Sequence, residues 1–111
     1  MLVRKMTPWR LGWPRMTKID VVFYEKTYSH CSQCKVMKNT LNQWIVQNPE
    51  SDVTVITASA EDNLDRLTNA YGTGLSAPIV EVTRNGDLNT VIGLNPDILV
   101  DYLSGLDSVW E

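Results

Sequence analysis

The chain has 111 residues, of which 43% are hydrophobic, and a formal net charge of −3. This length allows one domain with a modest core and excludes two, and the composition is typical of a soluble globular chain. No apolar run is long enough to span a membrane and no apolar signal core opens the sequence, so we expect a cytoplasmic protein.

Charge divides the chain into two unequal parts. Residues 1–18 carry five basic side chains and no acidic one, whereas residues 19–111 carry the other five basic residues and all thirteen acidic ones. Residues 1–18 show no helical or strand period, so we interpret them as a disordered extension, with Met16 as a candidate translation start. A basic segment with tryptophans can contact nucleic acid or a membrane surface, but the disordered tail is the preferred interpretation. Residues 19–111 are the predicted domain.

The first half of this domain predicts a strand, a helix and a second strand. Residues 19–24 are β-branched or aromatic, which indicates a buried strand. A helix is predicted from about Ser32 to just before Pro49, because four apolar side chains recur at helical spacing. These side chains are Met37, Leu41, Trp44 and Ile45. Residues 53–57 then form the second strand.

A second helix follows this strand. Ser59 and Asp62 form a capping-box-like pair at its start, and Gly72 marks its end. One face of the helix is apolar, which predicts that it packs against the sheet. The residues of this face are Ala60, Leu64, Leu67 and Tyr71.

The last part of the domain predicts a hairpin and a closing helix. Residues 79–83 and 89–92 are strands joined by an Asn-Gly pair at 85–86, a dipeptide typical of tight hairpins, so they are antiparallel neighbours. Asn, Pro and Asp at 95–97 supply an N-cap, a proline at the first helical position and an acid in the first turn. The side chains expected to be buried are Ile98, Leu99, Tyr102, Leu103 and Leu106. The order β-α-β-α-β-β-α predicts a four-stranded mixed sheet with helices on both faces.

Both cysteines and the single histidine of the chain lie together at residues 30–34. Cys31 lies at the N-terminal edge of the first predicted helix, where the helix end favours a thiolate and lowers its pKa below the ~8.5 of free cysteine. Cys34 lies on the same side, within disulfide reach, but is turned towards the protein. The pair therefore predicts an exchange in which Cys31 attacks a target disulfide and Cys34 resolves the mixed disulfide. The intervening Ser32 and Gln33 are expected to tune the redox potential.

Metal binding is the competing interpretation of a Cys-x-x-Cys motif. A closed zinc site needs about four ligands, and beyond Cys31 and Cys34 the chain offers only His30, which is poorly placed to share an ion with its neighbour. We therefore predict no metal and no cofactor other than the disulfide, while an iron–sulfur cluster bridging two copies stays open. His30 is interpreted as a solvated loop residue, with a second hypothesis that its cation helps to keep Cys31 ionised.

Three local motifs resemble those of the NrdH-type redoxins, which are glutaredoxin-like proteins of the thioredoxin superfamily. Residues 31–34, Cys-Ser-Gln-Cys, are similar to the C-x-Q-C of that family. Residues 76–80, Ser-Ala-Pro-Ile-Val, resemble its [QS]-A-P-V-V segment, and residues 93–97, Gly-Leu-Asn-Pro-Asp, resemble its G-F-x-P-D. The resemblance covers about residues 19–106 and depends mainly on the motif spacing. Leu94 departs from the family, which prefers Phe there.

The resemblance implies a thioredoxin-like, glutaredoxin-type fold with a cis Pro78 that faces the cysteine pair. It further implies a substrate site that uses Ser32, Gln33, Ala77 and Pro78, and Tyr28 is predicted to border the substrate groove. The implied function is electron transfer from a thioredoxin reductase-like flavoprotein to ribonucleotide reductase or another protein disulfide. We expect a monomer that binds neither nucleic acid nor membrane.

Two alternative functions stay open. A glutathione-dependent glutaredoxin has the same fold and cysteines but takes electrons from glutathione. Leu94, in place of the second glycine of glutaredoxins, and the nearby Pro96 weaken that alternative. The other alternative is a non-catalytic carrier of an iron–sulfur cluster or metal.

Overall fold

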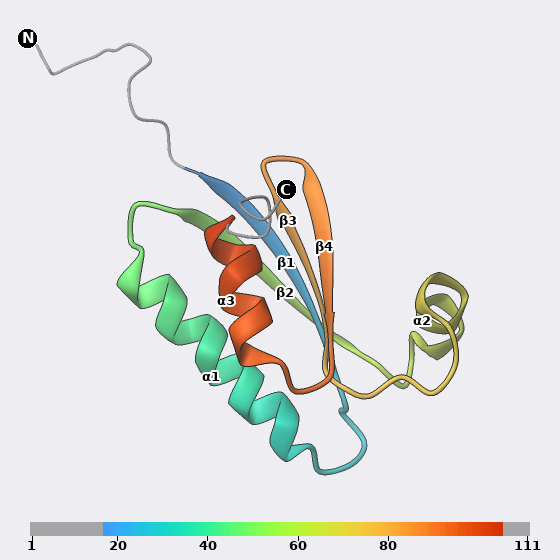
Figure 1. Ribbon diagram of the computed structural model, residues 1–111. Coiled ribbons are helices and arrows are strands. Elements are labelled where there is room, and N and C mark those ends of the chain that lie inside the picture. Colours follow the sequence, from blue (N-terminus) through green and yellow to red (C-terminus); the bar gives the residue numbers. More distant parts are fainter. Residues whose placement is uncertain (1–16, 106–111) are drawn as a thin grey trace, which may run out of the picture.

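The computed structural model describes residues 17–105, and its order of elements is the predicted β-α-β-α-β-β-α (Figure 1). The elements are β1 (Lys18–Glu25), α1 (Ser32–Gln47), β2 (Asp52–Ser59), α2 (Leu64–Tyr71), β3 (Ile79–Arg84), β4 (Asp87–Ile92) and α3 (Pro96–Ser104). Lys18, assigned from the sequence to the extension, is the first residue of β1. Residues 1–16 of the extension, with Met16, and the predicted core residue Leu106 lie outside the described residues.

The four strands form one mixed sheet in the order β2-β1-β3-β4. β1 and β2 are parallel because α1 connects them as a crossover, whereas β1 with β3 and β3 with β4 are antiparallel. The hairpin prediction is confirmed: Asn85 and Gly86 both have positive φ, at 52° and 92°, as a two-residue turn between twisted strands requires.

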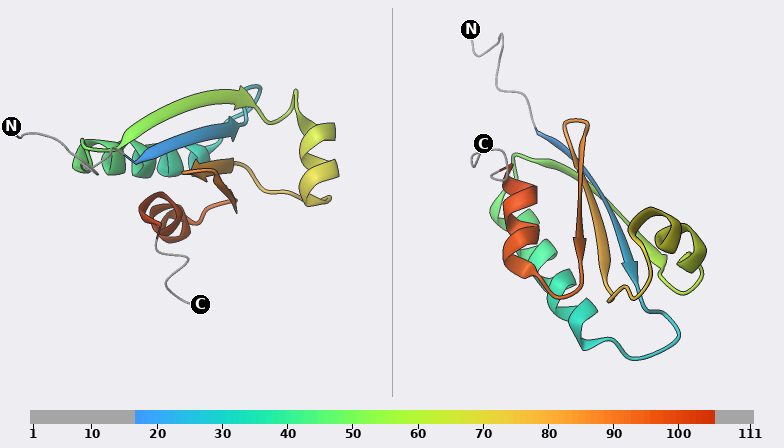
Figure 2. Two further views of the ribbon diagram at one scale, coloured as in Figure 1. Left: turned by 90° about the horizontal axis from the view of Figure 1, so that it is seen from above. Right: turned by 45° about the vertical axis from the view of Figure 1, so that its right-hand side comes forward.

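Helices α1 and α3 pack side by side on one face of the sheet (Figures 1 and 2). Alternate residues of β1 face these helices, since successive side chains of a strand point to opposite sides. The buried side chains of this core include Ile19, Val21 and Phe23 from β1, Met37, Leu41 and Trp44 from α1, and Leu99 and Leu103 from α3. Trp44 is thus a core residue as predicted, and its indole N–H donates to Ser104 Oγ at 3.1 Å.

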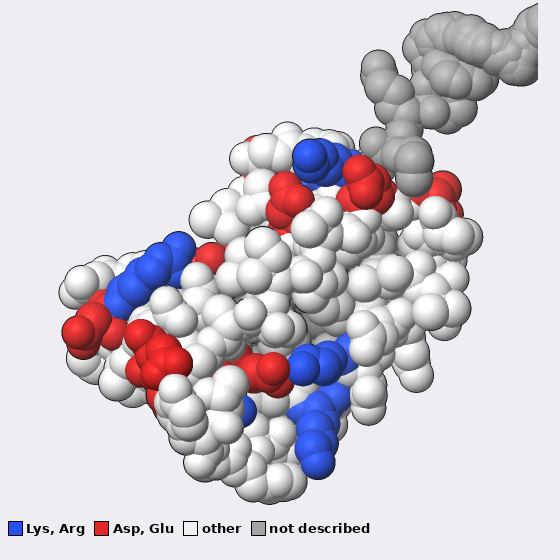
Figure 3. All heavy atoms as spheres, turned by 180° about the vertical axis from the view of Figure 1, so that it is seen from behind, with Lys and Arg blue, Asp and Glu red and all other residues white. Residues whose placement is uncertain are grey.

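Helix α2 lies beyond the carboxyl ends of β1 and β2 (Figure 2). It meets the opposite face of the sheet there through a smaller buried cluster of Tyr24, Ala60, Leu67 and Ile79. The prediction of helices on both faces therefore holds only at this end of the sheet. Seen from behind, much of the opposite face is free of charged side chains (Figure 3), and Ile56 of the edge strand β2 is 58% exposed.

The start of α2 was predicted too early. Ser59 Oγ does accept the N–H of Asp62, at 3.1 Å, but this bond closes a turn, and the helix begins only at Leu64. Of the apolar face predicted for this helix, Leu67 is fully buried, but Leu64, at the helix start, is 57% exposed.

The start of α3 was predicted correctly, with Asn95 as the N-cap residue and Pro96 in the first turn. The Asn95 side chain does not cap the helix, because its amide donates to the carbonyl of Ile92 at 2.8 Å. The prediction that Ile98 is buried was wrong, since its side chain is 42% exposed. Within residues 17–105, no helix combines the length and apolar character that a membrane span needs.

Candidate redox site

The cysteine pair lies where β1 gives way to α1. Cys31 is the N-cap residue of α1, with extended backbone, and its Sγ accepts the N–H of Cys34 at 3.2 Å. The two residues form a disulfide with a Cα–Cα distance of 5.3 Å. The predicted position of the pair at the helix start is therefore confirmed.

The two sulfurs have unequal surroundings. Cys34 is only 3% exposed and belongs to the main core, whereas Cys31 is half-buried at the surface of that core. The first turn of α1 contains no acidic residue, so nothing in that turn opposes the partial positive charge of the helix end at Cys31. A group arriving from solvent reaches Cys31 first, and the helix end stabilises this sulfur as a thiolate once the disulfide is reduced.

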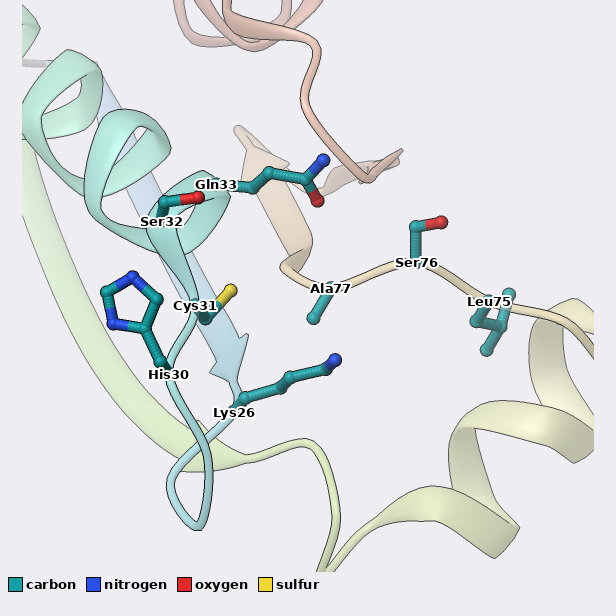
Figure 4. A pocket seen from close by; sticks show the side chains of 8 residues that line it. All are labelled: Lys26, His30, Cys31, Ser32, Gln33, Leu75, Ser76 and Ala77. Atoms are coloured by element: carbon teal, nitrogen blue, oxygen red, sulfur yellow. The ribbon is translucent and has the colours of Figure 1, made fainter.

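A cavity of about 310 Å³ opens beside Cys31 (Figure 4). Three parts of the chain form it: the segment before α1, the first turn of α1, and the loop before β3. The lining residues are Lys26, His30, Cys31, Ser32, Gln33, Leu75, Ser76 and Ala77. Four residues with a predicted catalytic or substrate-binding role therefore line one cavity, namely Cys31, Ser32, Gln33 and Ala77.

The Ala77–Pro78 peptide bond is cis, as the resemblance implied. Pro78 is fully buried and its carbonyl accepts the N–H of Gly93 at 2.8 Å, which ties the loop before β3 to the end of β4. Ala77, and not Pro78, lines the cavity. In Figure 4, Ala77 lies across the cavity from the Cys31 side chain.

Tyr28 is not among the residues that line this cavity, and its place at the border of the substrate groove stays a prediction. Its side chain is 71% exposed, and its hydroxyl donates to both carboxylate oxygens of Asp62, at 2.7 and 2.9 Å. These hydrogen bonds and the negative charge of Asp62 raise the pKa of Tyr28 above its ordinary value. The residue therefore contributes to a contact between two loops.

Sequence reasoning did not single out Lys26 or Leu75 as site residues. Lys26 directly follows β1, and its side chain extends into the cavity in Figure 4. Leu75 stands just before the Ser-Ala-Pro segment. The only sequence signal for these two residues was that they lie near the motifs. Loop geometry decides which neighbours of a motif point into the site, and the sequence does not show that geometry.

Among residues 17–105, no group of three or more His, Cys, Asp or Glu side chains is arranged to hold a metal ion. His30 lines the cavity, and in Figure 4 its ring and Ala77 lie on opposite sides of Cys31.

Comparison with known proteins places this geometry among solved thioredoxin structures. No family model matches the chain, and no curated protein matches it either. The oxidised form of mitochondrial thioredoxin 3 from Saccharomyces cerevisiae is 26% identical, with a TM-score of 0.53, over 73% of this chain and 72% of that one. The thioredoxin Deadhead from Drosophila melanogaster is 21% identical, with a TM-score of 0.57, over 80% and 81% of the two chains. A thioredoxin from Trypanosoma brucei brucei is 20% identical, with a TM-score of 0.53, over 81% and 75%.

The chain therefore has a thioredoxin-like α/β fold, with a four-stranded mixed sheet and a Cys-x-x-Cys disulfide at the start of α1. This fold and this pair of sulfurs define a thioredoxin-like dithiol–disulfide oxidoreductase. Proteins of this class work with a reductase on one side and disulfide substrates on the other.

Proposed function

We propose that the protein is an NrdH-type electron donor, which accepts electrons from a thioredoxin reductase-like flavoprotein and reduces a protein disulfide such as that of ribonucleotide reductase. The observation that carries the proposal is the disulfide of a half-buried Cys31 and a buried Cys34 beside an open cavity. The Cys-Ser-Gln-Cys, Ser-Ala-Pro-Ile-Val and Gly-Leu-Asn-Pro-Asp motifs support the NrdH type. We further propose that it acts as a monomer in the cytoplasm.

The reaction proceeds in two exchange steps. In the reduced protein, the Cys31 thiolate attacks one sulfur of the target disulfide, forms a mixed disulfide, and releases the other target sulfur as a thiolate. The Cys34 thiol then loses its proton and attacks Cys31 Sγ, which releases the second target thiolate and leaves the Cys31–Cys34 disulfide. Two electrons pass to the target, and the reductase returns two electrons and the protons that the dithiol needs.

The loop before β3 supports the binding of an extended substrate segment. Ala77 is at the surface of the cavity, and Pro78 offers no N–H of its own. We propose that a target segment runs alongside Ala77 and forms backbone hydrogen bonds with it, while its cysteine lies over Cys31. Ser32 and Gln33, exposed in the first turn of α1, contact the same segment.

A donor-specificity assay tests the proposal. The oxidised protein is incubated with NADPH and either thioredoxin reductase or the glutathione and glutathione reductase pair, and NADPH oxidation is followed. We expect reduction through thioredoxin reductase, whereas reduction by the glutathione system alone would make the protein a glutaredoxin. A coloured, metal-loaded protein that reduces no disulfide after anaerobic purification would instead indicate a cluster carrier.

A trapping experiment identifies the target. The Cys34→Ser variant keeps the attacking sulfur but lacks the resolving one, so it should accumulate the mixed disulfide with ribonucleotide reductase. The Cys31→Ser variant is the matched control and should trap nothing. If the Cys34→Ser variant and ribonucleotide reductase form no covalent complex, the proposed target is wrong even where the donor assay succeeds.

A further inference from the structure

Residues 26–30, between β1 and Cys31, form neither a helix nor a strand, yet two of their side chains line the redox cavity. Its two ends supply Lys26 and His30, which both line the cavity beside Cys31. A segment of this kind holds its side chains in place only if other parts of the protein bind its backbone, because ordering each residue costs about 1–2 kcal/mol of conformational entropy.

Glu61 binds this backbone at two consecutive amides. One carboxylate oxygen accepts the N–H of Thr27 at 2.9 Å, and the other accepts the N–H of Tyr28 at 3.3 Å. Hydrogen bonds from N–H groups to a charged carboxylate are stronger than those between neutral groups. One side chain from the loop after β2 therefore binds two consecutive amides of the segment that leads to Cys31.

Neighbouring contacts support the same attachment. Ser59, the last residue of β2, accepts the hydroxyl of Thr27 at 2.8 Å and donates to Glu61 at 3.2 Å. The backbone N–H of Ala60 donates to the carbonyl of Glu25 at 2.8 Å, just before the segment begins. Glu61 is thus held from the sheet side, so that its position follows that of β2.

Lys26 links this attachment to the sulfur. It lines the cavity at Cys31, and it also lines a second, more apolar cavity of about 170 Å³ together with Glu61, Leu64 and Leu67. The residue immediately before the two bound amides is therefore the one whose cation reaches the redox cavity (Figure 4). A cation near a thiolate stabilises it and lowers the pKa of the thiol.

We infer that Glu61 is a positioning residue for the redox site: by binding the amides of Thr27 and Tyr28, it keeps the Lys26 amine in the cavity with Cys31. The inference rests on the proposed dithiol exchange and adds the control of the Cys31 thiolate to it. Glu61 touches neither sulfur, so its effect on Cys31 passes through the segment and Lys26.

Glu61 is a charged carboxylate at neutral pH, so the attachment to the two amides is present there. The Thr27 N–H bond, in the first place, holds the pKa of Glu61 below its ordinary value of 4.5, and partial burial opposes this effect. Because its pKa is lowered, the Glu61 carboxylate stabilises the bound segment fully above its ordinary value of 4.5. This stabilisation is lost only as the pH falls through the lowered pKa. Lys26 lines the second cavity together with Glu61, and Tyr28 donates its backbone N–H to the Glu61 carboxylate while its hydroxyl donates to Asp62.

The direction of the effect separates positioning from simple charge. Loss of the negative charge of Glu61 would by itself make a nearby thiolate more stable and so lower the pKa of Cys31. Loss of the attachment would release Lys26 from the cavity and raise the pKa of Cys31. An upward shift in a Glu61→Gln variant therefore reports positioning.

The test measures the rate of Cys31 alkylation by iodoacetamide against pH, in a Cys34→Ser background that leaves one thiol. Glu61→Gln should move the midpoint upward by up to about one pH unit. Ser59→Ala should move it less and in the same direction. Asp65→Asn removes an equal charge from the exposed first turn of α2 and should leave the midpoint unchanged or slightly lower.

A double-mutant cycle tests the route through Lys26. With Lys26→Gln already present, Glu61→Gln should cause no further upward shift, because the cation that it positions is gone. Circular dichroism shows whether each variant is folded. The inference is overturned if Glu61→Gln behaves like Asp65→Asn, or if its upward shift persists undiminished beside Lys26→Gln. Neither result depends on a reductase or target, so the inference can fail while the proposed function stands.

Discussion

The chemistry of the site follows from the different surroundings of two sulfurs that are three residues apart. Cys31 caps α1 and faces the cavity, while Cys34 is packed in the core beneath the first turn of α1. A thiolate at Cys31 benefits from the helix end and from Lys26, whereas Cys34 is shielded from external disulfides. The order of attack, Cys31 first and Cys34 second, is a consequence of position.

The predicted role of Tyr28 at the substrate groove can be tested with a single substitution. Because its side chain lies outside the cavity and contacts Asp62, we expect a Tyr28→Phe variant to show the same KM for its protein target as the wild type. The backbone N–H that Glu61 binds is retained in this variant, so the pKa of Cys31 should also stay the same. A KM several-fold higher would instead confirm that Tyr28 borders the substrate groove. Steady-state kinetics with the trapped target provide the measurement.

Helix α2 meets the sheet only at one end, through a small apolar cluster and a set of polar contacts. Its Tyr71 donates a hydrogen bond to the buried Glu81 of β3 and accepts one from Thr90 of β4 at 3.0 Å. Arg66 lies 3.8 Å from the same Glu81 carboxylate and donates to the hydroxyl of Tyr24. A polar network thus complements the small apolar cluster between α2 and the sheet.

Tyr71→Phe should lower the free energy of unfolding by about 1 kcal/mol at neutral pH, since it leaves a buried carboxylate with one partner fewer. Burial, and then the hydrogen bond to Glu81, raise the pKa of Tyr71 above its ordinary value of 10.0. A raised pKa means that the stabilisation is complete below that value and is lost as the pH rises through the raised pKa. Urea unfolding should therefore show a gap between wild type and variant that narrows at alkaline pH. A constant gap would contradict the role of the phenol.

The apolar part of the α2 attachment depends on Leu67. This side chain is fully buried, so Leu67→Ala should cost about 2–5 kcal/mol of unfolding free energy. Leu64→Ala, one turn earlier and 57% exposed, is the matched control and should cost far less. Equal losses in urea unfolding would mean that the described packing of α2 is wrong.

For the whole molecule, the order of elements was predictable because local signals and tertiary structure agree. The helical spacing of Met37, Leu41 and Trp44 specifies a helix, and its apolar face packs in the core of the folded protein. The Asn-Gly pair at 85–86 specifies a hairpin turn, which the sheet contains. The start of α2 was not predictable in this way, because the Ser59 hydroxyl caps a turn as readily as a helix.

The same limit applies to the site. Its sulfurs and the loop at Ala77 follow from motifs, but Lys26 and Glu61 come together only through the contact of two loops that are far apart in sequence. Neither residue belongs to a pattern with a period or spacing. Such contacts depend on where the ends of β1 and β2 lie in the folded sheet, which a single sequence does not show.

The central claim is that the fold keeps one sulfur of the pair ionised and accessible. The most direct measurement is the pH dependence of iodoacetamide alkylation of Cys31 in the Cys34→Ser variant. We expect a midpoint clearly below the ~8.5 of free cysteine. A midpoint at or above that value would show that the surroundings of Cys31 do not stabilise its thiolate.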